Sequence, residues 1–350
     1  MPTIREVAKA CGVSPMTVSY VLNNPGRVRQ ETRTRVLLAM REMGYRPPAA
    51  ERGEEDARGT LTIGVVYSRW NRLEAEAPYY RRIVGGILEA ADDLVCHVTL
   101  FSHHSWEGNA YKSLRVYCDG RCDGLIIFAP KIGSDLVAAL RERGVPFVLV
   151  GDTGDLPEDW CVDVDNIAAA RNVTEYLLGL GHRRIAYLPG APNTRVTQQR
   201  EDGWRAALEA ADVAPTPAHL LPGDWSPESG RERAARLLSL PDGERPTALF
   251  CAFDGLALAA LAAAREMGLR VPQDVSIIGF DDIPAAPATE PPLTTVLQPY
   301  AEIGERAVRL LLTQMGGGSS ADAPGERKVL LPTKLIVRQS AGPPPPPGTA

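Results

Sequence analysis

A chain of 350 residues with 44% hydrophobic residues is long enough for two or three domains with buried cores. The start MPTIREVAKAC lacks the apolar core of a secretory signal, and no run of 18 apolar residues occurs, so we expect a cytoplasmic protein without a membrane anchor. Residues 1–48 carry a net charge of +5, whereas the remaining 302 residues carry −10. A basic head on an acidic body indicates that only the head meets a polyanion.

Cysteines and histidines do not indicate a metal centre. The six cysteines lack the paired spacing of metal ligands, and we expect reduced thiols at Cys11, Cys96, Cys118, Cys122, Cys161 and Cys251. The adjacent His103 and His104 are expected in an exposed loop rather than on a metal. We therefore expect neither a metal ion nor a cofactor.

The first helix of the basic head is expected to begin with a capping box. Thr3 can accept a hydrogen bond from the backbone amide of Glu6, and the Glu6 side chain can reach back to Thr3. Apolar residues then recur with helical spacing, which predicts a buried face made of Ile4, Val7, Ala8 and Cys11. Gly12 is expected to end this helix.

A second helix is expected after a short turn. Ser14 is placed to cap it, and Pro15 fits its first position, where a backbone amide is not needed. The inward face is expected to consist of Val18, Val21 and Leu22. The outward face is expected to consist of Met16, Thr17, Tyr20 and Asn23.

A third helix is expected over 31–43, with Val36, Leu37 and Met40 inward and Gly44 as its stop. Two helices joined by a tight turn, in a basic module of this size, indicate a helix-turn-helix that reads the major groove of double-stranded DNA. The second helix offers amides and hydroxyls to phosphates, and its outward side chains reach base edges. The alternative is a small helical cap whose charge bias is accidental.

From Leu61 onward, short apolar runs alternate with amphipathic segments. Strands are expected at 61–68, 97–102, 122–130, 145–152, 184–190, 247–253 and 275–282. Helices are expected at 79–94, 135–144, 166–181, 200–213, 230–240 and 254–268. The alternation predicts parallel sheets with helices on both faces. These strand-helix units are too many for one sheet. We therefore expect an α/β core of two similar lobes with a cleft between them.

Several of these segments resemble the LacI/GalR family of bacterial transcription regulators. They include TIREVAKACGVSPMTVSYVLN and ETRTRVLLAMREMGYRP in the head, and LGHRRIAYLPG, REDGWRAAL and VPQDVSIIGFDDIP in the body. The resemblance implies a helix-turn-helix head, a hinge helix that forms on DNA, and a two-lobed core like periplasmic sugar-binding proteins. It also implies a dimeric repressor of a palindromic operator whose effector is a sugar or sugar derivative.

The expected domains are a head over 1–46, a hinge over 47–60, a core over 61–340 and a disordered tail over 341–350. The resemblance implies crossings between lobes near 161–165, 289–295 and 325–332. One lobe would then comprise about 61–162 plus 292–325, and the other about 163–291 plus 326–340. No leucine heptad follows the core, so we expect a homodimer rather than a tetramer.

The resemblance implies three principal effector-binding residues. Arg200, in REDGW, can hold adjacent hydroxyls or a carboxylate with its planar guanidinium. Asp281, the first acid of FDD, can accept hydrogen bonds from paired hydroxyls, and Trp225 offers a flat face to a pyranose. The alternatives are that Arg200 and Asp281 pair with each other and that Trp225 belongs to the core.

Further residues follow strand ends, which face the cleft in such sheets. Trp70 and Tyr79 follow the first strand and are expected to line the pocket, with surface or interface packing as the alternative. Asp152 either lines the cleft or caps the next turn. Asp165 and Asn166 are expected to cap the following helix rather than to touch a ligand.

Phe253 departs from the family pattern, which commonly has an Asn that hydrogen-bonds a sugar hydroxyl at this position. A phenylalanine cannot make that bond, so Phe253 favours an effector with an apolar or aromatic portion, such as a glycoside, a disaccharide or a purine. A sugar or sugar derivative remains the first expectation, because Arg200, Asp281 and Trp225 occur together. A purine-like effector is the alternative.

The expected DNA contacts are Thr3, Ser14, Pro15, Met16, Thr17, Tyr20, Asn23, Arg27 and Arg29. The family often has Arg where Tyr20 stands, and Tyr20 cannot make a bidentate contact to guanine. Arg29 stands where the family commonly caps the third helix with a hydroxyl, so it is expected to reach a phosphate instead. These departures predict a changed half-site.

Two other kinds of protein share a two-lobed α/β body. A periplasmic ligand-binding protein would need a signal peptide and would lack the basic head. An enzyme such as a kinase or dehydrogenase would need a phosphate-binding loop, and neither G-x-x-x-x-G-K-[ST] nor a strand-linked G-x-G-x-x-G occurs. We therefore expect a regulator, with a small-molecule-binding protein of altered DNA recognition as the alternative.

The hinge departs furthest from the family, whose hinge leucine wedges into the minor groove and kinks DNA. In RPPAAERGEEDARG, Pro48 replaces the family Asn, Glu51 the Ala, and Glu54 the Leu. A carboxylate between bases would be desolvated and repelled by phosphates, so we expect no standard wedge. The double substitution Glu51→Ala with Glu54→Leu should therefore tighten operator binding and increase bending, measured by gel retardation of circularly permuted probes. Unchanged affinity and bending would contradict this interpretation of the hinge.

Overall fold

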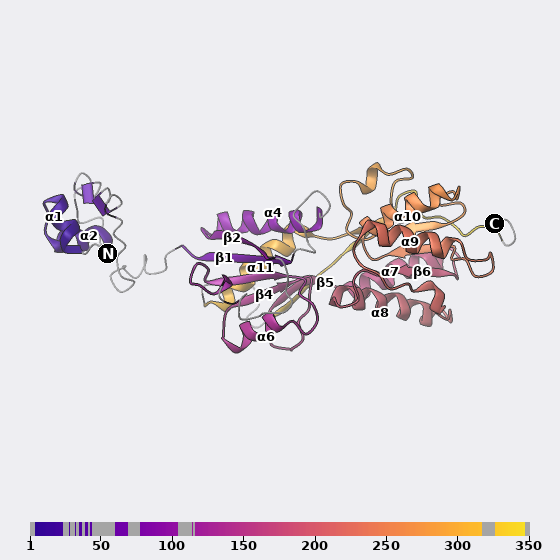
Figure 1. The fold of residues 1–350 in the computed structure, drawn as a ribbon, viewed down its shortest axis with the longest axis horizontal. Coiled ribbons are helices and arrows are strands. Elements are labelled where there is room, and N and C mark those ends of the chain that lie inside the picture. The colour runs from indigo at the N-terminus through magenta and orange to yellow at the C-terminus, as the bar shows by residue number, and fades with distance from the viewer. Residues whose placement is uncertain are drawn as a thin grey trace. The chain divides into compact units, whose positions relative to one another are not determined.

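The computed structural model describes residues 4–23, 60–68, 78–103, 114, 116–316 and 326–346, and between them positions 28, 32, 35–36, 39–40 and 43. The chain forms two compact units, Met1–Leu61 and Thr62–Ala350. Each unit is described by itself below, with the labels of Figure 1.

The first unit is helical, as the sequence predicts. Helix α1 (Ile4–Cys11) ends where Gly12 adopts a positive φ of 64°, and α2 (Pro15–Asn23) follows at once. The described positions between Thr32 and Met43 are helical as well. A shared core joins the three segments, and its buried members are Val7, Ala8, Cys11, Val18, Val21, Val36 and Met40. Leu22, Leu37 and Gly44, also expected in or after these helices, lie outside the described side chains.

The first lobe of the second unit is built on a six-stranded parallel sheet. In spatial order its strands are β10 (Lys328–Leu331), β5 (Cys161–Val164), β4 (Phe147–Val150), β3 (Gly124–Phe128), β1 (Thr62–Ser68) and β2 (His97–His103). Its helices are α4 (Pro78–Asp93), α6 (Asp135–Glu142) and α11 (Tyr300–Gln314). The central strands β3, β4 and β5 are buried along their whole length, because helices cover both faces.

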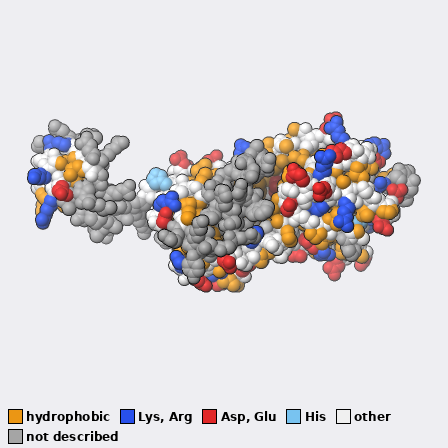
Figure 2. All heavy atoms as spheres, viewed as in Figure 1, with side chains coloured by type: hydrophobic (Ala, Val, Ile, Leu, Met, Phe, Trp, Pro, Cys, Tyr) orange, Lys and Arg blue, Asp and Glu red, His pale blue; other side chains and the backbone are white. Residues whose placement is uncertain are grey.

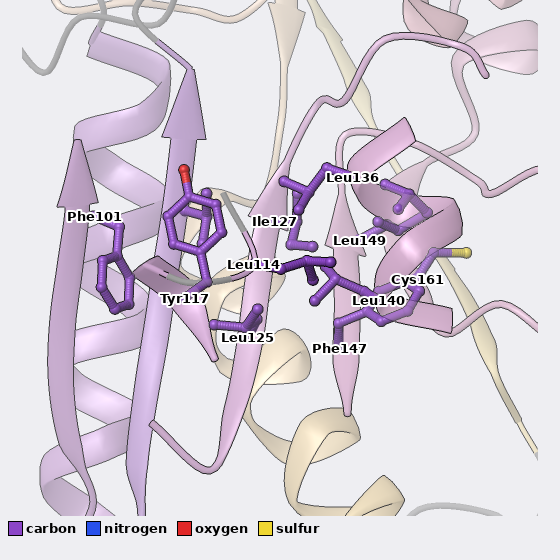
Figure 3. Packing of buried hydrophobic residues seen from close by; sticks show 12 residues of the cluster. Phe101, Leu114, Tyr117, Leu125, Ile127, Leu136, Leu140, Phe147, Leu149 and Cys161 are labelled. Atoms are coloured by element: carbon purple, nitrogen blue, oxygen red, sulfur yellow. The ribbon is translucent and has the colours of Figure 1, made fainter. Parts of the chain in front are cut away.

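Apolar side chains of α6 fill one face of this sheet. Leu136 and Leu140 pack with Ile127 and Leu149 from the two central strands, as Figure 3 shows. Helix α11 packs on the opposite face, where Leu311 lies against Gly124. The lobe is therefore a sheet between two helical layers, with α4 and α6 on opposite sides in Figure 1.

The second lobe repeats this plan on a smaller sheet. Its parallel strands, in spatial order, are β6 (Ile185–Leu188), β7 (Ala248–Cys251) and β8 (Ser276–Ile278). A separate antiparallel pair joins β9 (Thr295–Leu297) to β11 (Lys334–Ile336). Its helices are α7 (Asn166–Gly179), α8 (Arg195–Ala210), α9 (Pro227–Leu238) and α10 (Asp254–Glu266), with short turns η3 (Pro217–His219) and η4 (Ala286–Ala288). In Figure 1, α7 and α8 lie on one face of the sheet and α9 and α10 on the other.

The chain passes between the lobes three times. The crossings lie between β5 and α7, between β9 and α11, and between β10 and β11. The second crossing therefore follows Leu297, later than the expected 289–295, and β10 joins the first sheet although 326–340 was assigned to the second lobe. The sequence of a short apolar strand does not indicate which sheet the strand joins, because tertiary contacts decide strand pairing.

Residues 341–346 pack on the second lobe, so the expectation of a disordered tail over 341–350 was wrong for 341–346, and residues 347–350 lie outside the described residues. The Gly342 carbonyl accepts hydrogen bonds from the Ser276 hydroxyl at 3.0 Å and from His182 Nε2 at 2.8 Å. His182 is fully buried, and burial lowers its pKa. Amino-acid composition does not predict the packing of such a segment, because it contains no information on which backbone groups find buried hydrogen-bond partners.

All six cysteines are free thiols. Within the described residues, no helix is long and apolar enough to cross a membrane, and no group of three potential metal ligands is found.

The close crossing of α4 and α11 supplies a stability test. A Cβ atom placed on Gly86 would lie 2.3 Å from the carbonyl oxygen of Ala301, whereas a Cβ on the adjacent Gly85 would meet nothing within 4 Å. We expect Gly86→Ala to lower the stability of the core by about 1–3 kcal/mol, because the helices must separate. Gly85→Ala should be neutral or stabilising by up to about 1 kcal/mol. Thermal unfolding measures both, and equal melting temperatures for the two variants would contradict the packing.

Candidate functional site

The exposed side of α2 is the candidate DNA-reading surface. Ser14 caps the helix, since its Oγ accepts from the backbone amide of Thr17 at 3.0 Å, as expected. Met16 and Tyr20 are 65% and 39% exposed, although both are large and apolar in part. Among the described residues of the first unit, Arg5, Lys9 and Arg35 are exposed basic residues and Glu6 is an exposed acid. Blue basic side chains are visible on its surface in Figure 2. The helix thus presents a capped start and two large exposed side chains.

The other expected DNA contacts are only partly described. Pro15 is the exposed first residue of α2, and Asn23 is its last residue. Thr3, Arg27, Arg29 and the hinge over 47–58 lie outside the described residues, as does the Thr3 half of the capping box.

Arg200 lies at the centre of a polar cluster in the second unit. It comes from the buried face of α8 and is only 5% exposed. Its Nε donates to Asn166 Oδ1 at 2.9 Å, its Nη1 donates to the Ala252 carbonyl, and its guanidinium lies 3.5 Å from the centre of the Phe280 ring. Burial of a guanidinium needs such partners. They fix Arg200 at the ends of the strands of the second lobe.

Asp281 reaches the same cluster from the loop after β8. Its Oδ1 accepts from Gln298 Nε2 at 2.7 Å, and its backbone carbonyl accepts from the Tyr300 hydroxyl. Asp281 and Arg200 are each hydrogen-bonded to other groups and not to each other. Burial raises the pKa of Asp281 to about 7, against the opposing effect of Arg200. The backbone φ of 117° at Asp281 marks a strained loop held by these contacts.

Asp163 and Asn166 complete the cluster from the first crossing, and the sequence analysis did not assign them to the site. Asp163, on β5, accepts from the Val164 amide at 2.7 Å and from Asn166 Nδ2 at 2.9 Å. Burial raises the pKa of Asp163 to about 7. Asp165 caps α7 by accepting from the Ala168 amide, as expected, whereas Asn166 turns inward to Arg200. The alternating acids of VDVDN, Asp163 and Asp165, are a signal that could have raised this possibility.

Asp254 is a second buried carboxylate outside the predicted set. It accepts from the Thr295 hydroxyl at 2.6 Å and from the Ile283 amide at 2.9 Å. Burial and the nearby Asp281 raise its pKa well above the ordinary value. Asp254 therefore fixes the loop that carries Asp281 to β9, and we assign it a positioning role.

Aromatic side chains flank the polar cluster in both lobes. Trp225 and Phe253 form an edge-to-face pair with ring centres 5.1 Å apart, and both are partly exposed. From the first lobe, Tyr79 packs edge-to-face on Tyr300 at 5.5 Å. Burial, and after it the charge of Asp163, raises the pKa of Tyr79 well above its ordinary value. Trp70, the remaining expected pocket aromatic, lies outside the described residues.

Asp152 takes part in a contact between the lobes. Its Oδ1 accepts from the Gly154 amide at 2.6 Å, which caps the turn, and from Arg195 Nε of α8 at 3.1 Å. Arg195 also pairs with Asp155. Burial raises the pKa of Asp152 despite these partners. Both carboxylates thus hold the first lobe to the start of α8.

Two family models match the chain. The model of bacterial regulatory proteins of the lacI family matches residues 3–48, and that of the periplasmic binding protein-like domain matches 174–341. The transcriptional regulator DegA of Bacillus subtilis is 36% identical over 346 residues, which cover 97% of this chain and 98% of DegA. The chain belongs to the LacI family of bacterial regulators. The transcriptional repressor PurR of Pectobacterium carotovorum is 33% identical over 318 residues, covering 90% and 91%.

Solved structures agree with this assignment across the whole length. A complex of the transcriptional regulator CelR with cellobiose has 34% identity and a TM-score of 0.73, covering 97% of this chain and all of that one. The lac repressor dimer bound to operator and an anti-inducer has 29% identity and a TM-score of 0.77, covering 97% and 99%. The chain is therefore a DNA-binding transcriptional regulator of the LacI family and not an enzyme.

The buried carboxyls predict a dependence of core stability on pH. In the unfolded chain Asp163 and Asp281 have pKa values of about 4, and in the fold both rise to about 7, so their ionisation opposes folding. We expect stability to fall as pH rises from 5 to about 7 and then to level off. In Asp281→Asn this slope should be shallower by up to about 1.4 kcal/mol per pH unit. Urea unfolding at stepped pH measures the slope.

Asp242→Asn is the matched control, because the Asp242 side chain is 64% exposed. It should keep the slope of the unsubstituted protein. An Asp281→Asn variant with the same slope as the control would show that Asp281 is ionised throughout this range.

Proposed function

We propose that this regulator is a dimeric repressor of a palindromic operator, controlled by a sugar or sugar derivative that binds the polar cluster between its lobes. The family assignment supports DNA binding. The relatives named as repressors and the neighbours solved with operator or cellobiose support the remaining parts.

The observation that carries the proposal is a buried set of hydrogen-bonding groups contributed by both lobes. Asp163 comes from β5 of the first lobe, while Arg200 and Asp281 come from the second. Beside them, Gln298 Oε1 is buried with no hydrogen-bond partner. A buried acceptor without a partner is costly, and a ligand hydroxyl would satisfy it. Carboxylates, an amide and a guanidinium together suit a ligand rich in adjacent hydroxyls.

A ligand at this place can act on the angle between lobes. It would touch groups on both sides of the three crossings, so its binding energy would differ between open and closed arrangements. In a dimer, the lobe angle would set the spacing of two DNA-binding heads. Because two half-sites must be bound together, a change in spacing alters operator affinity strongly.

The proposed DNA contacts lie on α2. The start of α2 offers the Ser14 hydroxyl to phosphates, and Met16, Thr17 and Tyr20 are placed to meet base edges. Selection of bound sequences from a random duplex pool tests this part. The expected result is a palindrome of two short half-sites, and enrichment of sites without two-fold symmetry would contradict the dimer.

Asp281→Asn separates ligand response from DNA binding. We expect the variant to keep the operator affinity of the unsubstituted protein, because Asp281 lies in the second unit, but to need at least tenfold more sugar for a response. Loss of the carboxylate weakens the hydrogen bonds that it accepts. Fluorescence anisotropy of labelled operator, with sugars titrated in, measures both. Asp242→Asn is again the control, and an unchanged sugar response in Asp281→Asn would contradict the proposed site.

A further inference from the structure

A turn of the first lobe meets the start of α8, a helix of the second lobe, through charged side chains. The turn follows β4 and comprises residues 152–155. Arg195, the first residue of α8, donates from its Nε to Asp152 Oδ1 at 3.1 Å and from its Nη2 to Asp155 Oδ1. One guanidinium thus bridges two carboxylates of the other lobe, and its planar set of donors suits such a pair of acceptors.

The acidic turn is held in shape by its own lobe. Gly154, whose φ is 71°, lies against Asp159, because a Cβ atom on Gly154 would be 2.5 Å from the Asp159 Cβ. Asp159 is fixed in turn by an ion pair with Arg141 of α6 at 2.8 Å. Lys328 of β10 donates to the Thr153 carbonyl at 2.8 Å. The turn therefore presents its carboxylates in a preformed arrangement, so little conformational entropy is lost when the arginine binds them.

Two further hydrogen bonds join the lobes beside the ion pairs. Gln199, one helical turn after Arg195, donates to the Thr153 hydroxyl at 3.1 Å. The Ile132 amide, in the loop after β3, donates to the Asn193 carbonyl at 3.0 Å. This backbone hydrogen bond crosses from one lobe to the other, so it must break when the lobes separate.

We propose that Arg195 and the acidic turn form an electrostatic latch that sets how far the lobes open before any effector is bound. The inference goes beyond the proposed function, because the latch acts in the protein without ligand and lies outside the groups assigned to the effector. The side chains of Arg195 and Asp155 are 21% and 43% exposed, so water and salt partly screen their attraction. An ion pair of this kind shifts an equilibrium by up to about fivefold, which biases the lobes without locking them.

The latch affects ligands that never touch it. A ligand shifts the lobes only through the difference between its affinities for the joined and the separated arrangement. The latch therefore assists a ligand that binds the joined lobes and opposes one that binds the separated lobes. Arg200 lies on the same helix as Arg195, so an opening that breaks the latch also moves the guanidinium of the polar cluster relative to the first lobe.

Hydrogen/deuterium exchange of the full chain without ligand tests the latch. The reporter is the peptide that contains the Ile132 amide, measured by mass spectrometry, because the hydrogen bond of that amide crosses between the lobes. Arg195→Gln removes the charge and keeps a residue that favours helix. We expect this variant to speed exchange at Ile132 by at least about threefold. Asp155→Asn should speed it less, because Asp152 still accepts from the arginine.

Arg231→Gln is the matched control. Arg231 pairs with Glu266 at 2.6 Å inside the second lobe, and both side chains are more than half exposed. Its loss should leave exchange at Ile132 unchanged. The Val145 amide, which donates to the Leu140 carbonyl inside the first lobe, should exchange at the same rate in every variant and shows that this lobe stays folded.

Salt gives a second measurement on the same reporter. Raising NaCl to about 0.5 M screens the ion pairs, so exchange at Ile132 should become faster in the unsubstituted protein and not in Arg195→Gln. Equal exchange at Ile132 in Arg195→Gln and in the unsubstituted protein would overturn the latch, and so would an equal response of both to salt. Because no ligand is present, either result leaves the proposed sugar effector standing, and a failure to bind sugar leaves the latch standing.

Discussion

The burial of Arg200 is the constraint on which the rest of the proposed effector site depends. A guanidinium that is 5% exposed must find acceptors inside the protein, and it finds them in two separate segments, Asn166 after the first crossing and the carbonyl of Ala252 after β7. The Phe280 ring covers its face. One side chain thereby connects α8 to the start of α7 and to the ends of two strands.

The acids around it complete a strained arrangement. Asp163 and Asp281 are both buried near one arginine, and burial raises the pKa of each to about 7. Asp254 and Gln298 hold Asp281 in a loop of positive φ. Such groups lower stability, and their persistence at the junction of two lobes is typical of a functional site. A ligand that supplied hydroxyl donors would relieve part of this cost, which links binding to the arrangement of the lobes.

The edge-to-face pair of Trp225 and Phe253 lies beside this polar cluster. The contact of Arg195 with Asp152 and Asp155 holds the lobes together at another point, outside the polar cluster. The lobes are thus linked by groups that a ligand would touch and by groups that it would not, which is what a change of lobe angle requires.

The sequence by itself determined the local elements and the kind of protein. Helical spacing in the head, the cap at Ser14 and the stop at Gly12 depend on neighbouring residues, so they could be predicted from the chain alone. The family-like segments pointed to Arg200, Asp281, Trp225 and Phe253. Only the tertiary structure decided the pairing of β10 with β5, the packing of residues 341–346, and the convergence of Asp163, Asn166 and Gln298 on one cluster. These depend on contacts between residues distant in the chain, and such contacts leave no periodic pattern in a single sequence.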